Sequence, residues 1–288
     1  MDMNAFLAKH QLPLSYQQQC EQFFIPLAQQ INQAKQANSP LFVAINGCQG
    51  SGKTTLADFL VAWFTQHSAF NCIALSIDDF YLSKQRREQL AKTVHPLLVT
   101  RGVPGTHDVP LMRSTLAQLL AGNSKVPLPY FHKHLDDCAL PAQWPTNEAP
   151  VDIVILEGWC VGSKPQSPAA LAAPLNALEE QDDPQGVWRH YVNQCLKTEY
   201  LDLFAQFNYF VMLKAPSFSS VFNWRKQQEQ KLVARNGIHA GTMDDPQLQR
   251  FIAHFERITR NNLIALPQQA NALLELTEQR AISKLSFK

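Results

Sequence analysis

The sequence of 288 residues lacks an excess of charge, since 25 basic residues stand against 24 acidic ones and the formal net charge is +1. No overall field draws such a chain to nucleic acid or to an anionic membrane, so we expect neither as a partner. It also lacks any run of about 18 uncharged apolar residues, the length of a membrane span. The opening stretch MDMNAFLAKHQLPLSYQQQC has no basic region followed by an apolar one, so we expect a soluble protein without a cleaved leader.

The cysteines lack the spacing of a metal or disulfide motif. The six are Cys20, Cys48, Cys72, Cys138, Cys160 and Cys195. They are spread out without a C-x-x-C pair, which argues against a zinc cluster and against a disulfide framework. Reduced thiols in a cytoplasmic protein are the simplest interpretation. No repeat of solenoid period is present, and the length favours one α/β domain over residues 1–288.

Apolar periodicity divides the chain into alternating strands and helices. The expected strands span 41–46, 71–78, 151–159 and 207–215, with one or two more in 272–287, and the expected helices span about 16–36, 53–63, 111–122 and 251–266. The strands are apolar enough to be buried on both faces, as parallel strands are. This alternation predicts a three-layer α/β/α sandwich with a mostly parallel sheet.

Two long segments, about 79–110 and 158–200, interrupt the alternation. Connections of this length in a compact domain are usually functional or contain helices of their own. We expect both segments to crown one edge of the sheet.

A phosphate-binding motif follows the strand at 41–46. Residues 47–54 read GCQGSGKT and fit G-x-x-x-x-G-K-[ST] at every fixed position. In this motif backbone N–H groups wrap a polyphosphate, Lys53 reaches the β and γ oxygens, and the Thr54 hydroxyl ligates Mg²⁺. A plain glycine-rich turn would leave Lys53 unexplained. The predicted nucleotide site comprises Gly47, Cys48, Gln49, Gly50, Ser51, Gly52, Lys53, Thr54 and Thr55.

One side chain of this loop raises a separate question. Cys48 precedes a helix N-terminus, which would lower its pKa and make the thiol reactive. We interpret such reactivity as a liability without a catalytic role.

Two of the apolar strands end in acids. Glu157 closes VDIVILEGW, where an acid beside a phosphate-binding loop holds Mg²⁺ directly or through water; the alternative is a surface acid at a strand end. Asp78 and Asp79 follow CIALSI and point to opposite faces, so we expect different tasks for them. Because ligands lie beyond the carboxyl ends of parallel strands, Asp78 is placed to accept the proton of an attacking alcohol. The alternative is that one of the two acids caps a following turn or helix.

Several motifs together carry a resemblance. They are GCQGSGKTTL, SIDDFY, HPLLVTRGVPGTHD, LPYFHKHLDD, LEGWCVG, NALEE, WRHYVN and FNWRKQQEQKL. In this order, from about residue 41 to residue 275, they resemble the D-glycerate 3-kinase group of P-loop kinases. That group is similar to the uridine kinase, phosphoribulokinase and bacterial pantothenate kinase superfamily. The resemblance implies a P-loop NTPase fold with a helical lid over about 216–245.

The resemblance also implies roles for single residues. Asp78, the first acid of SIDDFY, would be the catalytic carboxylate, and Arg225 would be the lid cation, with Arg235 as a second candidate. RGVPGTHD would form part of the acceptor site, with Asp108 as an orienter. The implied sets are Asp78, Lys53 and Arg225 for catalysis, Arg101, His107, Lys133, Asp79 and Tyr81 for the acceptor, and Thr54 and Glu157 for the metal.

The chemistry of glycerate agrees with these residues. Its carboxylate calls for an Arg or Lys partner such as Arg101 or Lys133, although Arg101 could instead form an ordinary ion pair. Five aromatic residues near the motifs could stack on a nucleobase acceptor or belong to the core: Phe80, Tyr81, Tyr130, Phe131 and Trp159.

The sequence therefore predicts a kinase that uses ATP and Mg²⁺ to phosphorylate a small metabolite, with D-glycerate as the first choice. Two alternatives stay open. One is a different small alcohol, such as a nucleoside, pantothenate or a sugar phosphate. The other is a P-loop ATPase that acts as a regulator.

Overall fold

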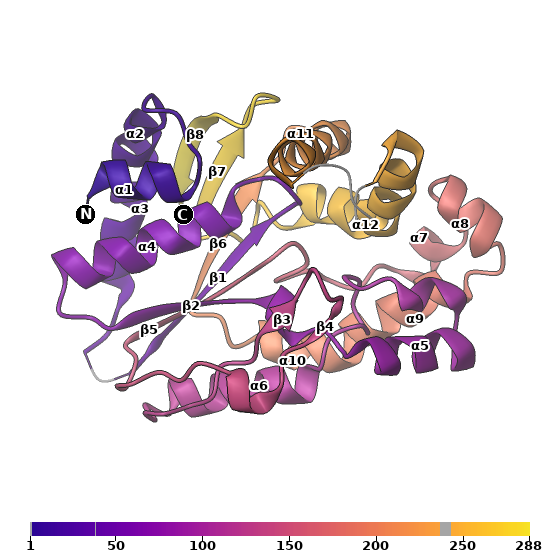
Figure 1. Cartoon of the computed structure of the whole chain (residues 1–288), viewed down its shortest axis with the longest axis horizontal. Coiled ribbons are helices and arrows are strands. Elements are labelled where there is room, and N and C mark those ends of the chain that lie inside the picture. The colour runs from indigo at the N-terminus through magenta and orange to yellow at the C-terminus, as the bar shows by residue number, and fades with distance from the viewer. Residues whose placement is uncertain (1, 38, 237–242) are drawn as a thin grey trace.

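A six-stranded sheet runs through the middle of the molecule, with helices on both faces (Figure 1). The structure is a computed structural model that describes residues 2–37, 39–236 and 243–288, leaving out the side chains of 231–236. Strand order across the sheet is β2-β5-β1-β6-β7-β8. The strands are β1 (Leu41–Gly47), β2 (Cys72–Ser76), β5 (Ile153–Gly158), β6 (Tyr209–Lys214), β7 (Ala272–Leu276) and β8 (Ile282–Phe287). All neighbours pair in parallel except β8, which runs antiparallel to β7.

The helices form two layers, one on each face of the sheet. α3 (Ile25–Ala34), α4 (Lys53–His67) and α11 (Phe218–Asn236) pack on one face, and α6 (Val109–Leu120), α9 (Val187–Cys195) and α10 (Leu201–Phe204) pack on the other (Figure 1). α12 (Asp245–Ala265) contributes apolar side chains to both layers. The predicted three-layer α/β/α sandwich with a mostly parallel sheet is confirmed.

The apolar patterns of the sequence match this packing. Every residue of β1 is buried, as expected for an apolar strand between two parallel neighbours. On α4 the spaced residues Leu56, Phe59 and Leu60 are fully buried against the sheet. The helix expected at 16–36 is present as α2 (Tyr16–Gln19), a π-helical turn η1 (Cys20–Phe24) and α3.

The two long segments contain helices of their own. The first holds η2 (Ile77–Phe80), α5 (Lys84–Thr93) and η3 (Pro96–Val99), and the second holds α7 (Pro168–Leu171), α8 (Ala177–Asp182), α9 and η5 (Leu196–Tyr200). Figure 1 shows α5, α7, α8 and α9 grouped at one end of the sheet. The remaining elements are α1 (Met3–Lys9), the hairpin β3 (Phe131–His132) and β4 (Asp137–Cys138), and η4 (Pro141–Gln143). Among the described residues, no helix combines the length and apolarity needed to cross a membrane.

Candidate active site

The phosphate-binding motif forms the turn between β1 and α4. β1 ends at Gly47 and α4 begins at Lys53, so the first turn of a 15-residue helix faces the loop. Gly50 has φ +79°, and a Cβ added there would lie 2.8 Å from the Cβ of Trp224 on α11. Because both the dihedral and the close approach exclude a side chain, this position requires glycine.

Cys48 does not have the reactivity that the sequence suggested. The thiol is buried, and burial raises its pKa to about 12 despite the nearby Lys53 ammonium. The reactivity prediction is therefore wrong, because it considered the helix N-terminus and not the cost of ionising a buried group.

Glu157 and Thr54 meet beside the phosphate-binding loop. β5 lies next to β1, so Glu157 at its end is carried to the start of α4. The Thr54 hydroxyl donates to Glu157 Oε1 at 2.8 Å, and Lys53 Nζ lies 3.9 Å from Glu157 Oε2. Glu157 Oε2 is buried without a hydrogen-bond partner. Burial raises the pKa of Glu157, although Lys53 opposes this, so the surface-acid alternative does not describe the residue.

Asp78 lies just beyond β2 in the short helix η2. Its Oδ1 accepts a hydrogen bond from the Tyr81 hydroxyl at 2.7 Å, and its Oδ2 accepts one from Lys133 Nζ at 2.8 Å. Burial alone would raise the pKa of Asp78, but the charges of Lys133 and Lys53 and these hydrogen bonds hold it well below its usual range. Asp78 is therefore an ionised carboxylate with a fixed orientation.

Asp79 points elsewhere. The alternation of an extended strand does not explain this, because the strand expected over 71–78 ends at Ser76 and both acids lie in η2. Asp79 Oδ1 accepts from the backbone N–H of Phe131 at 3.4 Å, and burial raises the pKa of Asp79 to about 6. Of the alternatives for Asp79, a helix cap or a partner that supports another site residue, the helix cap does not apply, because Ser76 caps η2 and Ser83 caps α5. Asp79 instead helps to hold the hairpin that carries Lys133.

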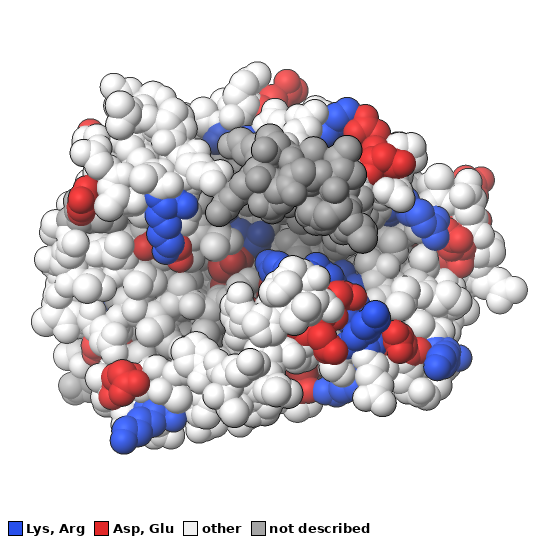
Figure 2. Space-filling view, in the orientation of Figure 1, with Lys and Arg blue, Asp and Glu red and all other residues white. Residues whose placement is uncertain are grey.

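A cavity of about 490 Å³ lies between the phosphate-binding loop and Asp78. Glu157 and Asp79 lie outside its wall. Its wall contains the phosphate-binding residues Lys53 and Thr54 together with Asp78, Tyr81, Arg101, Lys133, Trp159 and Arg225. On the face shown in Figure 2, basic and acidic side chains are interspersed, and several gather around a central hollow. Among the described residues there is no group of three or more His, Cys, Asp or Glu that would hold a metal ion by itself.

Arg101 has features of both alternatives that the sequence left open, a place in the site and an ordinary ion pair. It lines the cavity, and its guanidinium also forms an ion pair with Asp136. The guanidinium lies 5.5 Å from the centre of the Phe131 ring, a cation–π arrangement. Arg101 is thus held in place from two sides.

His107 lies behind the cavity wall and is not among the residues that line it. The side chain is 3% exposed and stacks on Tyr81 with ring centres 4.8 Å apart. Gly105 N–H donates to the Tyr200 hydroxyl, and that hydroxyl forms a hydrogen bond with His107 Nδ1 at 2.7 Å. Burial lowers the pKa of His107 to about 4. The arrangement supports Tyr81 with a neutral imidazole and does not provide the expected direct acceptor contact.

Arg225 reaches the cavity from α11. Its Nη1 lies 2.8 Å from Glu229 Oε2, one helical turn further along. Glu229 also accepts from the backbone N–H of Met243, which ties α11 to the start of α12. The side chain of Arg235 and part of the expected lid, residues 237–242, lie outside the described residues.

Other expected site residues have structural tasks. Asp108 caps α6 and forms an ion pair with Arg86, so it orients the helix after the acceptor loop. Of the five aromatic residues, Phe80, Tyr81, Phe131 and Trp159 are buried and only Tyr130 is exposed, at 49%. This burial favours the core alternative over base stacking.

Some cavity residues had no recognisable motif. Gln11, Phe251 and Phe255 also line the cavity, together with Gln228, which lies in the FNWRKQQEQKL motif but was not expected in the site. Gln11 comes from the turn after α1, and its place depends on the packing of that helix. The apolar spacing of α12 indicated buried Phe251 and Phe255, but periodicity alone does not distinguish a core residue from a cavity wall.

The chain is similar to several known kinases, although no family model matches it. It is 33% identical over 232 residues to Uncharacterized kinase mug58 of Schizosaccharomyces pombe, covering 77% of this chain and 81% of that protein. It is 30% identical over 225 residues to the chloroplastic D-glycerate 3-kinase of Arabidopsis thaliana, covering 75% of this chain and 46% of the plant protein.

A solved structure agrees with these relatives. D-glycerate 3-kinase from Cryptococcus neoformans superposes with a TM-score of 0.75 at 26% identity, covering 96% of this chain and 100% of that one. The similarity thus includes the sheet, the phosphate-binding loop and the helical segments around the cavity. The chain belongs to the D-glycerate 3-kinase family of P-loop kinases, and it is an ATP-dependent small-molecule kinase.

Proposed function

We propose that this kinase transfers the γ-phosphoryl group of MgATP to a hydroxyl of D-glycerate. One observation carries the proposal: the cavity that contains Lys53 and Thr54 of the phosphate-binding loop also contains the carboxylate of Asp78 and two further cations, Arg101 and Lys133. Two relatives bear the name D-glycerate 3-kinase, one from a plant and one from a fungus. We also propose a cytoplasmic location, where the six free cysteines stay reduced.

Asp78 is the base of the proposed reaction. A hydroxyl of the acceptor attacks the γ-phosphorus, the bond from that phosphorus to the β,γ-bridging oxygen breaks, ADP leaves, and the hydroxyl proton passes to Asp78. The Tyr81 hydroxyl, 2.7 Å from Oδ1, fixes the plane of the carboxylate. In P-loop kinases most of the rate comes from positioning and charge, so a base held in one orientation suits this task.

Thr54 and Glu157 would hold Mg²⁺. Both offer oxygen atoms, which are the ligands that Mg²⁺ prefers, and Glu157 Oε2 is a buried oxygen without a hydrogen-bond partner. When bound, the ion neutralises charge that develops on the phosphate oxygens. Two residues orient the carboxylate of Glu157. Lys53 Nζ stabilises its charge from 3.9 Å, and the Thr54 hydroxyl donates to its other oxygen.

Arg101 and Lys133 would bind the carboxylate of glycerate. Ionised donors make the strongest hydrogen bonds to carboxylates, and Arg101 is already oriented by Asp136 and Phe131. Arg225 would stabilise the transferring phosphoryl group from the α11 side of the cavity. His107 would act indirectly, through Tyr81.

The experiment is ATP turnover against a panel of acceptors: D-glycerate, L-glycerate, glycerol, uridine, pantothenate, ribulose 5-phosphate and no acceptor. We expect turnover to depend on D-glycerate, and glycerol, which has no carboxylate, to be poor. Turnover of another alcohol without turnover of glycerate would overturn the proposed substrate. ATP hydrolysis that no acceptor stimulates would instead favour a regulatory ATPase.

A further inference from the structure

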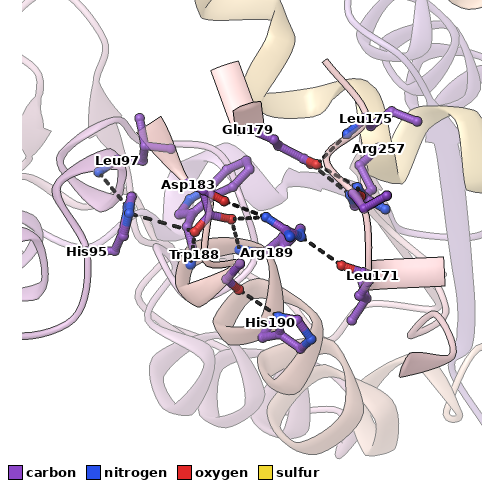
Figure 3. Close-up of polar contacts among 12 residues, drawn as sticks. His95, Leu97, Leu171, Leu175, Glu179, Asp183, Trp188, Arg189, His190 and Arg257 are labelled. Atoms are coloured by element: carbon purple, nitrogen blue, oxygen red, sulfur yellow. Dashed lines mark hydrogen bonds and ion pairs between the residues drawn. The ribbon is translucent and has the colours of Figure 1, made fainter. Parts of the chain in front are cut away.

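Two motifs of the resemblance have no part in the cavity, and they form a buried polar network instead. NALEE and WRHYVN supply Glu179 and Arg189, which lie with Asp183 and with Arg257 of α12 (Figure 3). All four charged side chains are buried. A buried ion pair contributes little net stability compared with apolar packing, so this cluster calls for another explanation.

The first pair fastens α12 to the segment that contains α7 and α8. Arg257 donates twice to Glu179, from Nε to Oε1 at 2.7 Å and from Nη2 to Oε2 at 2.5 Å. The same guanidinium donates to the carbonyls of Ala170 and Ala173, and Glu179 Oε2 accepts from Leu175 N–H. All three nitrogens of the guanidinium and both oxygens of the carboxylate are therefore hydrogen-bonded, which fixes the geometry of the contact.

The second pair fixes the start of α9. Asp183 accepts from the backbone N–H groups of Trp188 and Arg189 at 2.8 and 3.1 Å, and from Arg189 Nη1 at 3.0 Å. Arg189 Nε donates to the carbonyl of Leu171 at 2.8 Å. His95 Nε2 lies 3.8 Å from Asp183 Oδ1, so the other long segment also meets this carboxylate (Figure 3).

The two helices that these pairs hold, α9 and α12, pack closely against the loop 101–108. A Cβ at Gly105 would lie 2.7 Å from Tyr191 of α9, and a Cβ at Gly102 would lie 2.5 Å from Phe255 of α12. Gly105 N–H also donates to the Tyr200 hydroxyl at 3.1 Å. The loop that presents Arg101 is thus clamped between α9 and α12.

The nucleotide half of the cavity rests on a different core. Trp188 and Phe255 belong to the apolar cluster on one face of the sheet. Leu56 of α4 and Trp224 of α11, which back the phosphate-binding loop, belong to the cluster on the other face. α9 contributes to the first cluster alone, whereas α12 contributes to both, so the Asp183–Arg189 pair is the one whose disturbance reaches the acceptor loop apart from the core behind the phosphate-binding loop.

We propose that Asp183 and Glu179 are positioning residues for the acceptor. Through Arg189 and Arg257 they fix α9 and α12 against the loop 101–108, and so set the position of Arg101 in the cavity. The inference rests on the proposed function only in the identity of the acceptor. Glu179 and Arg189, which belong to two motifs of the resemblance, would then act on the acceptor from outside the cavity.

Neighbouring acids provide matched controls for a kinetic test. Asp183→Asn is compared with Asp182→Asn, since Asp182 pairs with Arg250 at the surface, where their side chains are 34% and 52% exposed. Glu179→Gln is compared with Glu180→Gln, whose wild-type side chain is exposed. We expect the acceptor KM of both test variants to rise about tenfold or more, because a misplacement near 1 Å costs up to ~10²-fold. The KM for ATP should stay within about twofold, and both controls should match wild type.

A purely structural role gives a different result. If Asp183→Asn lowers kcat through a smaller active fraction while both KM values stay at wild type, the proposal is overturned.

If the charge variants do not fold, Tyr200→Phe removes the hydroxyl that contacts Gly105 and leaves the ion pairs intact. We expect the same rise in acceptor KM, and a wild-type value would overturn the proposal. These assays use the acceptor of the panel that gives the highest turnover. The panel therefore tests glycerate as the substrate, and the KM values of the variants separately test the role of the ion pairs.

Discussion

Asp79 should make the stability of the protein depend on pH, and Asp79→Asn tests this. Burial raises the pKa of Asp79 from 3.8 to about 6. The replacement removes the ionisable group but keeps an oxygen that can accept from Phe131 N–H, the hydrogen bond that Asp79 makes now. The two proteins should therefore differ mainly in the cost of ionising a buried carboxyl group.

The sign and size of this pH effect on the free energy of unfolding follow from the linkage between proton binding and folding. Between about pH 4 and pH 6 the folded wild type binds more protons at Asp79 than the unfolded chain does, so its stability falls as pH rises through this window. A shift of about two pKa units corresponds to about 3 kcal/mol at most, since one unit is ~1.36 kcal/mol. Asp79→Asn should equal wild type near pH 4 and exceed it by up to about 3 kcal/mol above pH 7.

Urea denaturation of both proteins at several pH values from 4 to 8 measures the difference. Glu88→Gln, at an exposed position on α5, is the control. The difference in free energy of unfolding between this variant and wild type should be the same at every pH. A stability difference between Asp79→Asn and wild type that is constant over this range would refute the reasoning. In the same preparations Asp78→Asn should lose phosphoryl transfer but bind ATP, whereas Asp79→Asn should keep most of its activity.

Three further substitutions test single features of the cavity. Lys133→Met should raise the KM of an anionic acceptor about tenfold at unchanged KM for ATP, because a charged hydrogen bond is worth about 1.5–3 kcal/mol and this side chain is partly solvated; equal KM values in initial-rate assays would contradict this. Arg225→Ala should lower kcat about 10³-fold or more, and wild-type turnover with both substrates saturating would exclude the lid role. Gly50→Ala should weaken ATP binding in a nucleotide titration, because its Cβ would meet Trp224 at 2.8 Å. Gly122→Ala has a similar φ of +76° with open space around it, so an equal loss of binding there would refute the steric argument.

The sheet and the phosphate-binding loop could be predicted because their signals are local. The motif at residues 47–54 fixes its own turn, and buried parallel strands are apolar throughout their length. The position of Asp78 needed one more rule, that ligands lie beyond the carboxyl ends of the strands. These features depend on short stretches of chain and on the order of strands.

The parts that could not be predicted depend on contacts between distant segments. His107 belongs to the acceptor motif, yet Tyr81 and Tyr200 enclose it, and no local pattern indicates that stacking. Gln11 enters the cavity because α1 packs on the core that supports α4. Cys48 shows the same limit, since its burial and not its place before a helix decides its pKa.

The cations of the cavity explain how a nearly neutral chain can bind ATP and the anionic acceptor proposed above. Each has a carboxylate partner: Lys53 with Glu157, Lys133 with Asp78, Arg101 with Asp136, and Arg225 with Glu229. An anionic ligand must therefore compete with an existing partner, and the lost ion pair subtracts from the affinity. For Lys133 the exchange has a second effect. If the proposed acceptor carboxylate draws the ammonium away, Asp78 would lose its closest positive charge and become a stronger base at the moment when a hydroxyl needs one.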